Sequence, residues 1–81
     1  MHMKDNLVNF LYDKKYFITM YEQYVHVFNY KELISLNSDL IVLKMEDFVL
    51  NVKGRNLFVR QMMAHEILIK GEVESVMRSY E

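Results

Sequence analysis

The chain lacks cysteine and proline altogether and has only two glycines among its 81 residues. Without cysteine it forms neither a disulfide nor a thiolate metal site, a composition that is compatible with a reducing compartment. A domain of this size buries only about 60–65% of its unfolded surface, so a small core needs support from elsewhere. Self-association or a partner chain is the remaining source of that support. Hydrophobic residues make up 52% of the sequence, slightly above the usual share, which favours the same conclusion.

Charge of one sign and long apolar runs are also missing. Ten basic and eleven acidic residues are spread evenly and give a net charge of −1, so the electrostatic attraction that dominates nucleic-acid binding is absent. The longest apolar run, Leu40–Leu43, is too short to span a bilayer. The patch Leu7–Tyr12 has neither the length nor the cleavage site of a signal peptide. We therefore expect a soluble cytoplasmic protein with no transmembrane segment of its own.

Residues that could carry chemistry are few. The three histidines, His2, His26 and His65, do not show the local spacing of a metal site. His65 and Glu66 are adjacent, but neighbours along a strand point to opposite faces and cannot act as an acid–base pair. No serine lies in a Gly-x-Ser-x-Gly elbow, and glycine is too scarce for a phosphate-binding loop. The sequence predicts no catalytic, metal or cofactor residue and no small-molecule substrate, so we expect a protein that is not an enzyme.

The second half of the chain contains a repeated sequence pattern. The run Leu50–Gly54 is repeated in pattern by Ile67–Gly71, seventeen residues later, and these runs hold both glycines. Because glycine takes positive φ without a Cβ clash, each predicts a turn that ends a strand. Breaks at Asn37-Ser38 and Tyr21-Glu22 continue the spacing upstream. The sequence therefore predicts four successive strand–turn–strand units, with Gly54 and Gly71 as structural turns.

The period of the apolar residues divides the chain in two. In residues 1–15, Leu7, Phe10 and Leu11 follow helical spacing, and Asp5 can cap the first turn, which predicts an N-terminal tail with a short helix over residues 5–13. From Tyr16 onward the period is two, and β-branched and aromatic residues dominate. Residues 16–81 are therefore predicted to form a single β domain.

That domain should be all-β, with about eight short strands at regular spacing. Short turns favour antiparallel neighbours, in a meander or a small sandwich, because parallel pairs need long crossovers. The regular repeat leaves a flattened β-solenoid, with equivalent strands stacked in parallel, as the alternative.

The second face of these strands is not cleanly polar, as a solvated sheet would require. Either the sheet folds over itself and buries both faces, or another chain covers one of them. As possible interface residues we identify Phe48, Phe58 and Leu68, together with Val73 and Met77 of a closing strand that we expect to be an exposed edge. The residues that lie out of phase with the main apolar set are Phe17, Tyr24, Phe28, Ile41, Leu43, Phe48, Phe58 and Leu68.

The segment Leu50–Val76, LNVKGRNLFVRQMMAHEILIKGEVESV, resembles the YabP/YqfC family of small bacterial sporulation proteins. Val52-Lys53-Gly54 and Leu57-Phe58-Val59 match the first parts of the family pattern, Ala64–Ile67 stands at its turn, and Ile69–Val76 matches its last part. The similarity extends over about residues 16 to 77 and is closer to the YqfC branch. The resemblance implies a non-enzymatic factor made in the mother cell of an endospore-forming bacterium, with genes beside one for a membrane protein. It brings no catalytic or cofactor residues.

Two functions follow as expectations. The first is a non-enzymatic sporulation protein that acts as a small β-sheet interaction module in the mother-cell cytoplasm. It would bind its own copy or a membrane-associated sporulation protein, which would hold it at a membrane. The second is a small β-barrel that binds single-stranded nucleic acid. Tyr16, Phe17, Tyr24 and Phe28 would then be stacking platforms. The even charge argues against the second, and we expect no nucleic-acid partner.

Overall fold

The computed structural model describes residues 16–80 and contains six strands and no helix within that range. The predicted helix over residues 5–13 lies outside the described residues. All pairings are antiparallel, and the strands form one sheet in the order β1-β2-β6-β5-β4-β3. The strands are β1 (Phe17–Met20), β2 (Tyr24–Phe28), β3 (Glu32–Leu36), β4 (Leu40–Lys44), β5 (Val49–Met62) and β6 (Glu66–Ser79).

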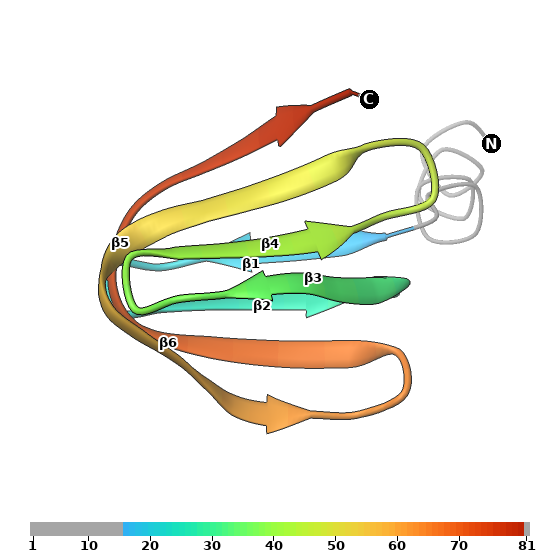
Figure 1. The fold of residues 1–81 in the computed structure, drawn as a ribbon. Coiled ribbons are helices and arrows are strands. Elements are labelled where there is room, and N and C mark those ends of the chain that lie inside the picture. Colours follow the sequence, from blue (N-terminus) through green and yellow to red (C-terminus); the bar gives the residue numbers. More distant parts are fainter. Residues whose placement is uncertain (1–15, 81) are drawn as a thin grey trace, which may run out of the picture.

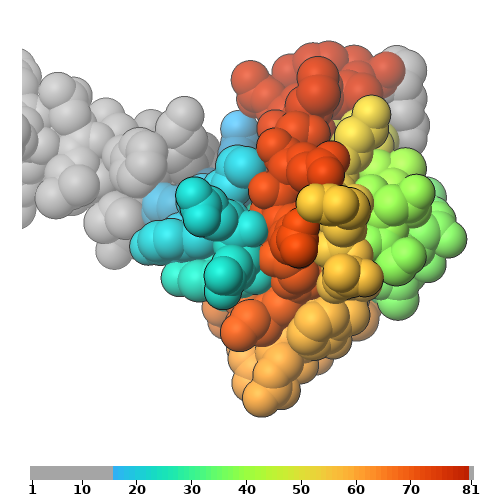
Figure 2. Space-filling model, turned by 90° about the vertical axis from the view of Figure 1, so that its left-hand side faces the viewer, coloured from blue at the N-terminus to red at the C-terminus, as the bar shows by residue number. Residues whose placement is uncertain are grey.

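The last two strands are long, and each bends near its middle, so that the single sheet folds over itself into two layers (Figure 1). The first layer consists of β1, β2, the first half of β6 and the second half of β5. The second layer consists of β3, β4, the first half of β5 and the second half of β6. Seen from the bent side, β2 and β4 lie on opposite sides of the β5–β6 hairpin (Figure 2).

This architecture confirms the all-β class and the antiparallel pairing, and it excludes the flattened solenoid. The predicted count of eight strands is wrong. The apolar runs on either side of Gly54 are two halves of β5, and those on either side of Gly71 are two halves of β6. Backbone pairing between β5 and β6 continues past both glycines with local shifts in register, because bulges bend a strand without ending it.

The core lies between the two layers. Val25 and Val27 of β2 pack in one cluster with Ile41 and Leu43 of β4, and all four side chains are fully buried. The other residues that are 1% exposed or less are Met45, Leu50, Val52, Ile67 and Ile69. Ile41, Leu43 and Phe48, three of the out-of-phase residues, belong to this core. These three residues are therefore out of phase because the sheet packs against itself, and not because another chain covers them.

The two glycines occupy the bend for reasons that differ in part from the prediction. Gly71 has φ of 130°, a region that L-residues avoid, whereas Gly54 is not among the residues with positive φ, so that prediction was wrong for Gly54. At the bend the two strands cross closely. A Cβ at Gly54 would overlap the carbonyl oxygen of Glu72, and a Cβ at Gly71 would lie 2.5 Å from the carbonyl oxygen of Asn56. Both positions therefore require glycine because backbone passes directly over them.

The backbone hydrogen bonds at the bend explain why the pattern Leu50–Gly54 is repeated by Ile67–Gly71. Gly54 donates its N–H to the carbonyl of Asp39, just before β4, and Gly71 donates to the carbonyl of Gln23, just before β2, each at 3.1 Å. Further along each long strand, a second amide donates to the residue before that acceptor, from Leu57 to the carbonyl of Ser38 at 2.8 Å and from Val73 to the carbonyl of Glu22 at 2.9 Å. The two layers thus repeat one arrangement, in which a short hairpin docks against a glycine-bearing bend.

Candidate interaction face

The outer face of the first layer carries most of the exposed aromatic side chains on the strands. Register places its residues in three rows across the strands, because directly paired residues share a face. The rows are Phe17–Phe28–Glu66, Thr19–His26–Leu68–Gln61 and Tyr24–Lys70–Phe58. We call the five apolar members, Phe17, Tyr24, Phe28, Phe58 and Leu68, the aromatic face.

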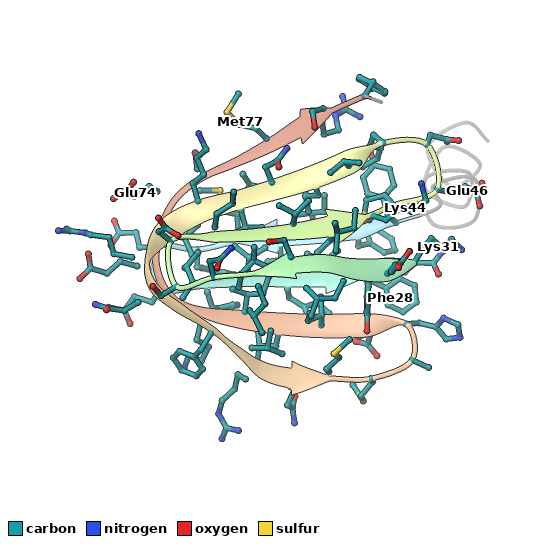
Figure 3. The ribbon with its side chains drawn as sticks, in the orientation of Figure 1. Phe28, Lys31, Lys44, Glu46, Glu74 and Met77 are labelled. Carbon is teal, nitrogen blue, oxygen red and sulfur yellow. The ribbon has the colours of Figure 1, made fainter. Side chains whose placement is uncertain are left out.

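The aromatic face is open to solvent over much of its area. Phe28 is 38% exposed and Phe58 is 50% exposed, and the other three side chains are partly buried. The rings of Phe17 and Phe28 pack against each other across the β1–β2 pair, with their centroids 6.2 Å apart. Phe28 projects near the open end of the sandwich, away from the bend (Figure 3). The five apolar side chains share this outer face with the polar members of the three rows.

A tyrosine pair extends this surface at the β1–β2 turn. The rings of Tyr21 and Tyr24 stack with centroids 4.5 Å apart and planes 27° apart. Desolvation, and after it a hydrogen bond with the Tyr21 side chain, raises the pKa of Tyr24 above the usual value of a tyrosine. The Tyr24 hydroxyl adds a polar group to this face.

One polar pair interrupts the aromatic face. His26 Nε2 lies 2.9 Å from Glu66 Oε1, and both side chains are 36% exposed. Such a partly exposed pair stabilises a fold by at most about 1 kcal/mol. Sequence reasoning missed this contact, because the two residues are forty positions apart and meet only through the β2–β6 pairing. The adjacent pair His65-Glu66, considered from the sequence, is not the pair that forms.

The equivalent outer face of the second layer is mainly polar. Its three rows are Glu32–Lys44–Val49–Ser79, Ser35–Val42–Asn51–Met77 and Leu40–Lys53–Ser75. Within it, Asn51 Nδ2 donates to Ser79 Oγ at 3.0 Å. Lys44 stands at the position that corresponds to Phe28, and Asn51 at the one that corresponds to Leu68. Since both layers share one backbone arrangement, the fold itself does not require the aromatic residues of the first layer.

The structure separates the five interface residues that the sequence suggested. Phe58 and Leu68 come together on the aromatic face. Phe48 is only 6% exposed and belongs to the core, so its proposal as a contact residue needs correction. Val73 is partly buried against the core, and Met77 is 58% exposed on the outer face of the second layer.

The burial of Phe48 has a clear physical cause. It lies at the open end of the sandwich, and three side chains pack around it there. The ring of Tyr16 meets it edge-on at 5.0 Å, the Arg78 guanidinium lies 5.3 Å from its centroid, and Tyr80 lies 6.3 Å away. The two-residue period could not show this, because Phe48 lies in the β4–β5 turn, where alternation along a strand does not apply.

The stacking residues of the nucleic-acid hypothesis are only partly assembled. Phe17, Tyr24 and Phe28 share the aromatic face, but Tyr16 packs against Phe48 at the end of the core. The charged members of the three rows are Glu66 and Lys70, so this face has no basic groove for a phosphate backbone.

Beside Phe58, a shallow hollow of about 280 Å³ lies where the aromatic face meets the bend. Its lining residues are Gln23, Asn56, Phe58, Lys70, Gly71 and Glu72. Across residues 16–80, no three His, Asp or Glu side chains gather in a way that could hold a metal ion. In the same range, no helix is long and apolar enough to cross a membrane. The aromatic face therefore has a shallow recess at its edge, beside Phe58.

The family model described as the YabP family matches residues 13–80, which covers the whole described sandwich. No curated protein matches the chain.

Proposed function

Because the chain belongs to the YabP family, we propose that it is a non-enzymatic sporulation protein that works as a small β-sheet interaction module in the mother cell. The family match is consistent with a role in sporulation. The resemblance of Leu50–Val76 supports the YqfC branch within that family. The partner we propose is a membrane-associated sporulation protein, which would hold this cytoplasmic chain at a membrane surface.

The aromatic face is the observation that carries this proposal. Interfaces are enriched in aromatic residues, and a few buried aromatic anchors supply most of the binding energy. Here Phe28 and Phe58 are exposed on a rigid sheet, where docking costs little conformational entropy. The matching positions of the second layer are polar, although the same backbone supports them. Among the strand residues, exposed aromatic rings therefore occur on the outer face of one layer only, which supports that face as the docking surface.

The rows also indicate what kind of partner fits. The apolar side chains are spread over the four strands of this layer, with the His26–Glu66 pair among them and Lys70 between Tyr24 and Phe58, so the net charge of the face is small. A partner that combines apolar and polar side chains, such as one face of an amphipathic helix, would cover the rings and offer hydrogen-bonding groups to His26, Glu66 and Lys70. The hollow beside Phe58 would receive one side chain of that partner.

Removing the two exposed rings should impair sporulation without unfolding the protein. In the double variant Phe28→Ser and Phe58→Ser, each truncation should weaken partner binding by about 2 kcal/mol, as for other aromatic anchors. We expect a marked loss of heat-resistant spores in a strain that carries this variant. The matched control is Val42→Ser with Lys53→Ser, on the outer face of the second layer, which should sporulate normally. Equal spore yields from the two strains would contradict the proposal.

A further inference from the structure

The folded sheet has four edges, and three of them are protected against strand addition. In the first layer, β1 is only four residues long, and the second half of β5 carries a register shift between Val59 and Gln61. In the second layer, β3 has a register shift between Leu33 and Ser35. Short strands and bulges are the usual devices that stop an edge from pairing with another chain.

The fourth edge begins directly after a register shift at Glu74 and has none further along. From Ser75 to Ser79, β6 pairs with β5 in unbroken register, from Ser75–Lys53 to Ser79–Val49. Its other side pairs with no strand among the described residues, because β2 reaches only as far as Lys70. Figure 1 shows this half of β6 running along the rim of the sandwich toward the C-terminus. We call Ser75–Ser79 the free edge.

Charge along this part of β6 is arranged asymmetrically. Glu72 and Glu74 come first, at the bend, and Arg78 comes last, one residue before the end of β6. Figure 3 labels Glu74 and Met77 on this half of the strand. If two copies pair in parallel, Glu74 lies opposite Glu74 and Arg78 opposite Arg78, and like charges directly opposite each other destabilise a strand pair. If they pair antiparallel about Val76, Glu74 of each copy lies opposite Arg78 of the other.

We propose that the free edge pairs antiparallel with the free edge of a second copy, about a twofold axis at Val76. The second layers of the two copies then form one continuous sheet, and each exposed Met77 lies opposite Ser75 of the other copy. A symmetric dimer uses the same patch on both subunits, and the charge pattern of this edge is complementary to itself in that arrangement. The aromatic faces belong to the first layers and stay available to the partner discussed above.

A charge-swap experiment on the full chain tests this proposal. The acidic-edge variant is Arg78→Glu, and the basic-edge variant is Glu72→Lys with Glu74→Lys. By sedimentation velocity, the wild type should have twice the 9.8 kDa mass of the chain, and each variant alone should be a monomer. An equimolar mixture of the two variants should return to the mass of a dimer, since each acidic edge then meets a basic one. Arg60→Glu, on the protected edge of β5, is the matched control and should remain a dimer.

Circular dichroism must show that each variant is folded, because Arg78 also packs over Phe48 and donates to the Tyr16 hydroxyl at 3.2 Å. If Arg78→Glu does not fold, the basic-edge variant keeps the test decisive, since it leaves Arg78 in place. A monomeric wild type, or a dimer that survives the basic-edge changes, would overturn the proposal. A dimer lost instead in Phe58→Glu would assign self-association to the aromatic face. Neither result depends on the sporulation partner, so the two proposals can fail separately.

Discussion

Replacing Gly54 with alanine is expected to destabilise the domain by about 3 kcal/mol, through overpacking and backbone strain at one site. The added Cβ would overlap the carbonyl oxygen of Glu72, which is backbone of the paired strand and cannot rotate away. Gly71→Ala should have a similar effect, since φ there is 130° and its Cβ would meet the Asn56 carbonyl. The core of so small a domain supplies little more than this amount, so both variants should be largely unfolded.

Arg55→Ala is the matched control, at the residue next to Gly54. Arg55 is highly exposed, and it forms surface ion pairs with Glu72 at 3.0 Å and with Glu74 at 3.7 Å. Its loss should change the free energy of unfolding by less than about 1 kcal/mol. Urea denaturation followed by circular dichroism measures all three variants. A Gly54→Ala variant as stable as Arg55→Ala would mean that the two strands do not cross as closely as the structure shows.

The second large effect separates two phenylalanines that sequence reasoning grouped together. Phe48→Glu should unfold the domain, because truncation of a buried phenylalanine alone costs about 3–5 kcal/mol and a buried carboxylate adds to that cost. Phe58→Glu should remain folded, because the side chain is half exposed and a surface change in a strand costs less than about 1 kcal/mol. Thermal unfolding monitored by circular dichroism distinguishes the two.

The stabilities of Phe48→Glu and Phe58→Glu test whether the aromatic face is a free surface. If Phe58→Glu unfolds the protein as Phe48→Glu does, Phe58 is ordinary core and the face is not a free surface. If Phe48→Glu melts at the wild-type temperature, the packing of Tyr16, Arg78 and Tyr80 around Phe48 is wrong. Leu68→Ser, on the same face as Phe58, is a second variant that should fold.

The sequence predicted the class of the fold because strand periodicity is a local property. Alternation at Val25 and Val27, and at Ile67 and Ile69, correctly marks residues that are fully buried. The five turns between the six strands and the two bends at Gly54 and Gly71 also coincide with breaks in that pattern. The prediction that each glycine lies in a turn that ends a strand was wrong. A bend within a paired strand and a turn between strands have the same local sequence pattern.

The candidate site was harder to predict because it depends on pairing between distant strands. The first half of β6 inserts beside β2, which brings Leu68 next to His26 and places Glu66 within hydrogen-bond distance of that histidine. Nothing in the local spacing of these residues indicates that neighbourhood. The sequence did show apolar residues on the second face of the strands. Ile41 and Phe58 are both out of phase with the main apolar set, but the structure places them in different environments. One is buried between the layers, and the other is exposed on the outside.

The most direct test of the aromatic face as the partner-binding surface is site-specific photo-crosslinking in sporulating cells. A benzoylphenylalanine is placed at Phe58 in one strain and at Lys53, on the polar outer face of the second layer, in another. The account predicts that light produces a covalent adduct with another protein from position 58 during sporulation, and none from position 53. Adducts of equal yield from both positions, or from position 53 alone, would contradict it.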